Sequence, residues 1–190
     1  MSAHRTLVER RGPDPVPRMD IEEHLRLDRG EAASGYMNAL IRAATQYVSD
    51  STWLGLVEEE WLITLDAFPD AGVGLYPTPI RSVESVEYED KAGQTVTVDP
   101  SEYRLVLKNA SAKIEPVNDW PAGVEPGSVR VRYTTGFQPA EIPAQAVHAI
   151  RMLVAHWYAM REPVITGGRT YEVPMAVDAL VEQIAVRRFL

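Results

Sequence analysis

Side chains that commonly do chemistry are few in this sequence, and their spacing does not suit catalysis or metal binding. The chain has 190 residues and no cysteine, which excludes disulfides, thiolate metal sites and cysteine nucleophiles. Its histidines are His4, His24, His148 and His156. Metal ligands on one helix stand about three to five residues apart, whereas His148 and His156 are eight apart with no carboxylate between them. We therefore expect no metal site.

Catalytic motifs are missing as well. The sequence contains no nucleophile elbow, phosphate-binding loop, zinc-protease motif or dinucleotide fingerprint. A carboxylate cluster does occur at Glu58, Glu59 and Glu60, but acid–base catalysis needs two carboxyl groups whose environments separate their pKa values. Three consecutive glutamates at the start of a predicted strand are typical of a solvated segment. The sequence predicts neither catalytic residues nor a bound cofactor.

The negative charge of the chain is concentrated in its middle. In total, 19 Lys and Arg stand against 27 Asp and Glu, and the net charge of −8 argues against a surface that grips nucleic acid or an anionic membrane. Residues 51–140 carry 7 basic and 14 acidic side chains, so nearly all of the excess lies there. One interpretation is that these charges keep an exposed sheet soluble, and the other is a surface that faces DNA without binding it.

Helical periodicity occurs before and after this acidic region. Asp20 and Glu23 have the spacing of a capping box, and apolar residues then recur at helical intervals up to Asp50. Helical spacing returns after Pro143. We expect a core of about four helices, within residues 20–50 and 143–188, whose apolar faces pack on one another.

Between these helices, alternating apolar and polar residues predict one antiparallel sheet of about five or six strands over residues 58–135, with a hairpin around the turn at 90–94. The predicted fold class is α+β: a helical core with an antiparallel β insertion between the N-terminal and C-terminal helices. Residues 1–18, rich in arginine and proline, are predicted to form an extended arm ahead of one domain over residues 19–190. A solvated tail is the alternative for the arm.

No apolar run reaches the roughly 18 residues of a membrane-spanning helix, and the N-terminal residues lack the apolar core of a signal peptide. We expect a soluble protein, without a membrane partner, that is made in the cytoplasm of its host.

Eight segments that follow one another over about residues 19–189 are distinctive as a set. They are DIEEHLRLD, LIRAATQYVSDST, EEWLITLDAFPD, LYPTPIRSVESVEYEDKAGQTVTVDPSEYRLVL, KIEPVNDWP, VRVRYTTGF, IPAQAVHAIRMLVAHWYAMREPV and VPMAVDALVEQIAVRRF. In order and spacing this set resembles the head–tail connector proteins, also called adaptor or head-completion proteins, of long-tailed phages and of phage-derived gene transfer agents. The arm before residue 19 lies outside the resemblance.

The resemblance implies a structural virion protein with no active site and no cofactor. In the family, a dodecameric ring docks under the portal protein at the capsid vertex and receives a stopper or tail-completion protein on its far face. Double-stranded DNA passes through the ring without specific binding. The protein would then be located in the neck of the particle, between capsid and tail.

Two sets of residues are candidates for these contacts. An aromatic residue, an aliphatic residue and two arginines at the C-terminus have the composition of an interface anchor for the portal or a neighbouring subunit, although they could instead fold back on their own helices. They are Arg187, Arg188, Phe189 and Leu190. An acidic channel lining would repel passing phosphates, and its candidates are Glu58, Glu59, Glu60, Glu84, Glu87 and Glu89.

Two other functions remain open from the sequence. The chain could be a different ring protein of the neck or tail, such as a stopper or a tail terminator. It could also be a small-molecule-binding or hydrolytic domain with Trp61, Trp120 and Trp157 as pocket walls.

Overall fold

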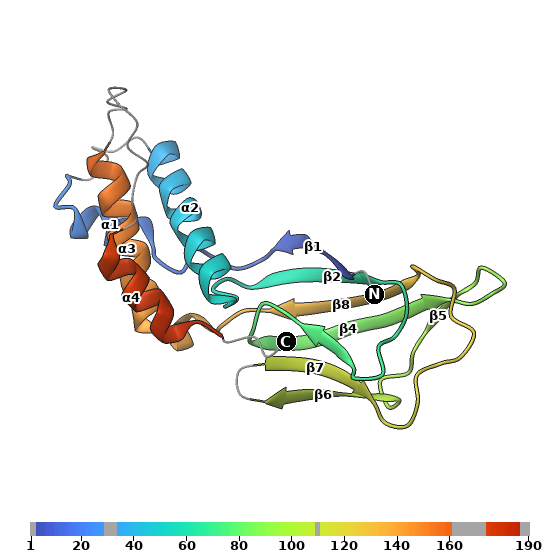
Figure 1. The fold of residues 1–190 in the computed structure, drawn as a ribbon. Helices are drawn as coiled ribbons and strands as arrows, with labels where there is room; N and C mark the ends of the chain where they lie inside the picture. The colour runs from blue at the N-terminus through green and yellow to red at the C-terminus, as the bar shows by residue number, and fades with distance from the viewer. Residues whose placement is uncertain (1–2, 29–33, 109–110, 161–173, 187–190) are drawn as a thin grey trace, which may run out of the picture. The chain divides into compact units, whose positions relative to one another are not determined.

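The computed structural model describes residues 3–28, 34–108, 111–160 and 174–186, and in these ranges it contains four α-helices and eight β-strands (Figure 1). The chain forms two compact units. Residues 14–56 and 138–186 make a helical unit, and residues 3–13 and 57–137 make a β unit. The predicted α+β class, with antiparallel strands between the N-terminal and C-terminal helices, is confirmed.

The helical unit is built around α3 (Ala144–Ala159), which contacts α1 (Arg18–His24), α2 (Ser34–Thr52) and α4 (Met175–Ile184). A 3₁₀ turn at Pro139–Glu141 precedes α3. Helices from both ends of the chain therefore pack on each other, as their apolar periodicity predicts. Their shared core consists of Ile21, Met37, Ile41, Ala44, Val48, Ala146, Ala149, Ile150, Leu153, Val154, Val177 and Val181.

The capping box predicted at Asp20 is wrong. Helix α1 begins two residues earlier, at Arg18, and the flanking Pro17 is extended with no side-chain cap. Asp20 lies in the first turn, where a negative charge suits the helix dipole, and its carboxylate accepts a hydrogen bond of 2.9 Å from Arg151 on α3. The residue therefore ties two helices together instead of capping one.

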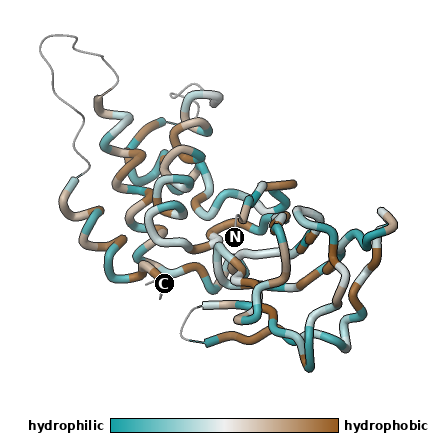
Figure 2. The backbone as a smooth tube through the Cα atoms, turned by 45° about the vertical axis from the view of Figure 1, so that its right-hand side comes forward, coloured by the Kyte–Doolittle hydropathy of each residue, from teal (hydrophilic) through white to brown (hydrophobic). Residues whose placement is uncertain are grey.

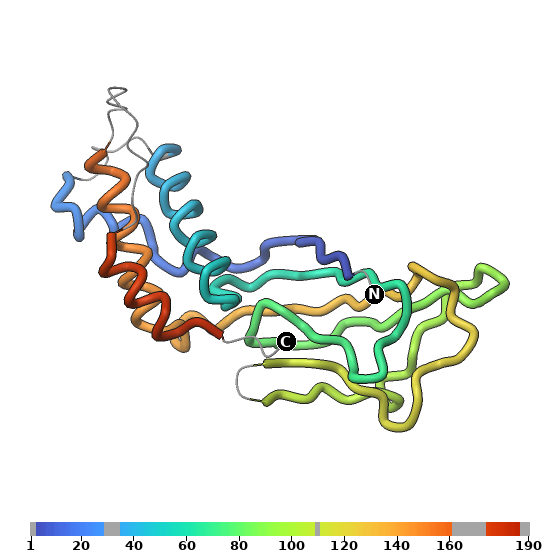
Figure 3. Tube along the Cα trace, in the orientation of Figure 1, coloured from blue at the N-terminus to red at the C-terminus, as the bar shows by residue number. Residues whose placement is uncertain are grey.

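The first sheet of the β unit has five antiparallel strands in the order β1-β2-β8-β4-β5. Figure 3 traces the N-terminal strand, in blue, alongside β2. The predicted hairpin is confirmed in β4 and β5, whose turn is held by the Asp90 carboxylate accepting from the backbone N–H groups of Ala92 and Gln94. The strands are β1 (Ala3–Arg10), β2 (Glu59–Leu65), β4 (Ile80–Glu89), β5 (Thr95–Thr97) and β8 (Val129–Thr135).

A second, three-stranded sheet has the order β3-β7-β6, so the single sheet predicted for this region is wrong. Its strands are β3 (Val73–Leu75), β6 (Tyr103–Lys108) and β7 (Ser111–Pro116). Hydrophobic and hydrophilic positions alternate along the strands (Figure 2), and one buried cluster joins residues of both sheets, such as Ile63 and Val131 with Leu75 and Ile114. The apolar face of each sheet is buried by packing against the apolar face of the other sheet.

The extended arm predicted for residues 1–18 is not a separate element. Ala3–Arg10 form β1, which pairs with β2 from Ala3↔Leu65 to Arg10↔Glu59, and Arg18 already belongs to α1. Backbone pairing with an existing sheet does not require apolar side chains on the added strand, so composition alone does not reveal such a strand.

Candidate interaction surfaces

The outer face of the first sheet is polar and carries several of the predicted acidic residues. Ile63, Val131 and their alternate neighbours point into the core, so the residues between them point outward. Register places Glu60 beside Thr134, Leu62 beside Arg132, and Thr64 beside Arg130. Arginines of β8 thus run down the middle of this face, between the carboxylates of β2 and β4.

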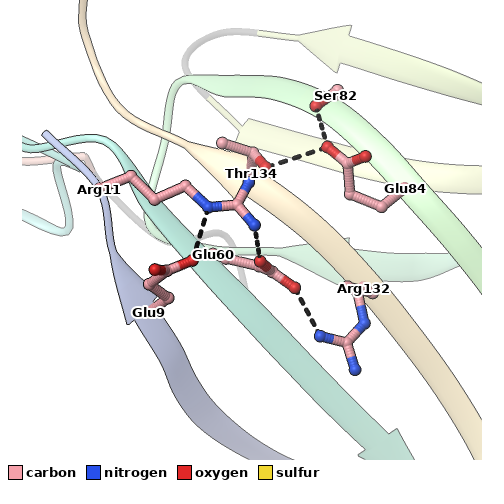
Figure 4. A network of polar contacts seen from close by, with 7 residues as sticks. All are labelled: Glu9, Arg11, Glu60, Ser82, Glu84, Arg132 and Thr134. Carbon is pink, nitrogen blue, oxygen red and sulfur yellow. Dashed lines mark hydrogen bonds and ion pairs between the residues drawn. The ribbon is translucent and has the colours of Figure 1, made fainter.

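Glu60 is the centre of a network on this face (Figure 4). Its side chain is only 6% exposed, and it accepts hydrogen bonds from the guanidinium groups of Arg11 and Arg132. Arg11 also donates to Glu9 at 2.9 Å. The donation from Arg132, reinforced by Arg11, lowers the pKa of Glu60 below its ordinary value. The network joins the chain after β1 to β2 and β8.

Glu60 makes the β unit sensitive to acid. Because its folded-state pKa is lowered, the carboxylate contributes stability above about pH 4.3, the ordinary pKa of glutamate, and that contribution disappears as the pH falls through the folded-state pKa. We expect Glu60→Gln to lower the thermal midpoint near neutral pH and to reduce the fall in midpoint on acidification. Thermal unfolding of both proteins across this range measures the difference. If the thermal midpoints of the two proteins fell in parallel with pH, the prediction would be contradicted. The control is Glu141→Gln, at an exposed position of the helical unit.

The other predicted carboxylates also have partners on the strands. Glu58 pairs with Arg81 at 2.6 Å, and Glu89 pairs with Arg130. Glu84 accepts from Ser82 and Thr134, at 2.6 and 3.0 Å. In addition, Glu59 accepts from the Trp61 indole, and Glu87 lies opposite Arg130 in the sheet register. Arginines therefore compensate much of the charge of Glu58, Glu60 and Glu89.

Negative charge is concentrated in four loops at one end of the β unit, at the right in Figure 1. These loops, residues 66–72, 90–94, 98–102 and 117–128, carry seven acidic side chains and one basic one, Lys91. Backbone hydrogen bonds connect them to one another or to the adjoining strands, for example from Gly127 to Asp66 and from Val117 to Glu102. We call this surface the acidic loop end; its acidic residues are Asp66, Asp70, Asp90, Asp99, Glu102, Asp119 and Glu125.

An open hollow of about 500 Å³ lies within the acidic loop end. Its aromatic wall is Phe68 stacked on Trp120, with ring centroids 4.4 Å apart, and the Trp120 indole donates to the Pro69 carbonyl at 3.1 Å. Asp70 and Asp119 are among the lining residues, whereas Trp61 and Trp157 are not. The lining residues include no serine, threonine, histidine or lysine that could act as a nucleophile or as its base.

The predicted anchor, Arg187, Arg188, Phe189 and Leu190, lies outside the described residues. The described chain ends at Val186, which is 8% exposed and donates its backbone N–H to the Thr52 carbonyl at 2.9 Å. The chain is therefore still packed and hydrogen-bonded within the helical unit at the residue that precedes this segment.

Among the described residues, no helix has the length and apolar character needed to cross a membrane. In the same ranges, no three His, Asp or Glu side chains converge as a metal site would require.

Comparisons with known proteins point to one kind of assembly. No model of a known protein family matches the chain, and no curated protein matches it. Among solved structures, it is similar to a chain in the neck of an empty gene transfer agent (GTA) particle computed with C6 symmetry. That match has 26% identity and a TM-score of 0.74 and covers 98% of this chain and 97% of the other.

Two more chains have the same fold. One is in the virion of a native GTA particle, with 23% identity, a TM-score of 0.78, and coverage of 98% of this chain and 97% of that one. The other is in the neck of a native GTA particle computed with C12 symmetry, with 24% identity, a TM-score of 0.68, and coverage of 96% and 98%. Both units of the present chain are therefore included in each match.

Proposed function

We propose that this protein is a structural, non-enzymatic component of the neck of a phage-like or gene transfer agent particle, where it forms an adaptor ring under the portal. The observation that carries the proposal is the match to a chain of a GTA neck over nearly the full length of both chains. Because the match covers 97% of the compared chain, the shared fold, and not an additional domain, accounts for the place of that chain in the neck. The sequence resemblance to head–tail connectors supports the same assignment independently.

A ring of twelve identical copies is the assembly that we propose. The compared necks were computed with C6 and with C12 symmetry, and twelve subunits are compatible with both. A cyclic ring uses a heterologous interface, in which two different surfaces of each copy meet. Each copy must therefore present one surface to the next copy and another to the previous one.

In this ring we assign the C-terminal segment to the portal and the negative surface to the DNA channel. The strand carboxylates Glu58, Glu60 and Glu89 are paired with arginines, so we extend the proposed channel lining to the acidic loop end. A duplex carries about one negative charge per 1.7 Å of axis, and loop carboxylates would repel it over about 8 Å at physiological salt. Repulsion of this range keeps DNA from adhering during its passage.

Co-expression with the portal protein of the same particle tests the proposed function. We expect the two proteins to co-purify, and electron microscopy to show a twelve-subunit ring of this chain on the portal. Particles lacking the protein should contain filled heads without tails. A chain that bound only tail proteins would instead be a stopper or tail terminator, and failure to bind any neck protein would contradict the proposal.

A further inference from the structure

Strand β1 is attached to the β unit without apolar burial. None of its eight residues is buried, and Leu7 and Val8 are 42% and 45% exposed. Strands β2 and β8, in contrast, bury alternate residues in the core. Segments with few buried apolar contacts open at a lower free energy than the core. Apolar burial therefore holds β1 less firmly than it holds β2 and β8.

Polar contacts hold β1 in place, and those described here have their partners in the β unit. Besides the pairing with β2, the Arg5 guanidinium lies 5.6 Å from the ring centroid of Tyr76. Beyond the strand, Arg11 binds Glu60, and the backbone N–H groups of Arg11 and Gly12 donate to the Glu58 carbonyl at 2.8 and 3.0 Å. A second copy of the chain displays the same partners, so it could receive β1 with the same contacts.

The hinge that follows β1 is short and stiff. Gly12 is bound to the β unit, whereas Val16 is fully buried in the helical unit, and Pro13 and Pro15 stand between them. Four residue steps span at most about 14 Å, and proline restricts the accessible conformations further. Short hinges of this kind favour exchange of an element between copies over pairing within one copy.

We propose that β1 is an exchange strand: in the assembled ring it pairs with β2 of the neighbouring copy, and each copy receives β1 from the copy on its other side. This inference rests on the ring of the proposed function. The exchange gives a head-to-tail interface that closes around the ring and leaves no β2 edge unpaired. Contacts within and between copies are equivalent, and the ring would hold the β2 edge of the neighbouring copy close to β1, so exchange costs no contacts.

Because the chain has no cysteine, introduced cysteines report the pairing directly. Thr6 and Leu62 are Cα partners across β1 and β2, a separation that a disulfide can span. Rings assembled on the portal from Thr6→Cys,Leu62→Cys chains should give, after oxidation, a ladder of covalently joined chains on denaturing gels. Rings from an equal mixture of the two single variants should give covalent dimers. The control pair, Thr64→Cys and Arg130→Cys, joins β2 to β8 and should crosslink within one chain.

The outcomes separate this inference from the proposed function. A ring in which Thr6→Cys and Leu62→Cys crosslink only within one chain, as the control does, would overturn the exchange and leave the ring intact. A protein that forms no ring by electron microscopy would overturn the proposed function, and the exchange with it. Interchain ladders for the test pair together with intrachain crosslinks for the control would establish the exchange.

Discussion

Removal of residues 187–190 is expected to weaken attachment to the portal by at least about 30-fold while leaving the chain folded. An aromatic or arginine anchor at the centre of an interface typically contributes about 2 kcal/mol or more, which corresponds to roughly 30-fold in affinity. The shortened chain retains the described contacts of the helical unit, because the last of them is the hydrogen bond from the Val186 N–H to the Thr52 carbonyl. Binding of the shortened chain to purified portal, with circular dichroism to follow folding, measures both parts of the prediction.

A matched control replaces an exposed apolar residue of the described chain. Met175 on α4 is 88% exposed, so Met175→Ser removes apolar surface from the helical unit without touching the C-terminal segment. We expect this variant to bind the portal like the unaltered chain. If the shortened chain bound equally well, the C-terminal segment would not be the anchor, and the portal contact would have to be sought on the described surfaces.

The helices could be predicted from the sequence because their burial follows a local period. In α3, Ala146, Ala149, Ile150, Leu153 and Val154 recur at intervals of three and four residues, and all are buried. The same holds for the alternation in β8, where Val129, Val131 and Tyr133 face the core. Local periodicity indicates which side of a helix or strand is buried. It was therefore sufficient to predict the fold class.

The division into two sheets could not be predicted, because it depends on contacts between distant segments. Strand β3 has only three residues, and it is fixed by pairing with β7 some 40 positions later, from Val73↔Ile114 to Leu75↔Ala112. Strand β1 was missed for a related reason. An edge strand exposed on both sides has no alternation to detect, and its place is set by the unpaired edge of β2.

The arginine partners of the strand glutamates could not be predicted from the sequence. A run such as Glu58 to Glu60 is conspicuous in the sequence, yet in the folded chain Glu58 pairs with Arg81, and Glu60 pairs with arginines from two other segments. The exposed acidic residues of the loops stand singly among turn residues such as Pro69 and Gly127, where Asp is common for local reasons. Only the folding of four separate loops to one end brings their charges together.

Reversing charge on the acidic loop end is expected to slow DNA ejection in a salt-dependent manner. Asp70, Glu102 and Glu125 are exposed, so Asp70→Lys, Glu102→Lys and Glu125→Lys together change the charge of each copy by six units with little effect on packing. New lysines would bind phosphates, and each contact formed adds about 0.9 to the slope of log affinity against log salt. Particles should still assemble. The ejection rate, followed by release of DNA at several salt concentrations, should be lowest at low salt.

The same charge change elsewhere distinguishes a channel role from an effect of net charge. Glu23, Glu141 and Glu182 are exposed on the helical unit, and their replacement by lysine also adds six units per copy. A slow, salt-sensitive ejection confined to the loop variant is expected, because screening limits the interaction to about 8 Å and only residues beside the duplex can act on it. Equal slowing by both variants, or by neither, would mean that the loop carboxylates do not face DNA and serve only to keep the β unit soluble.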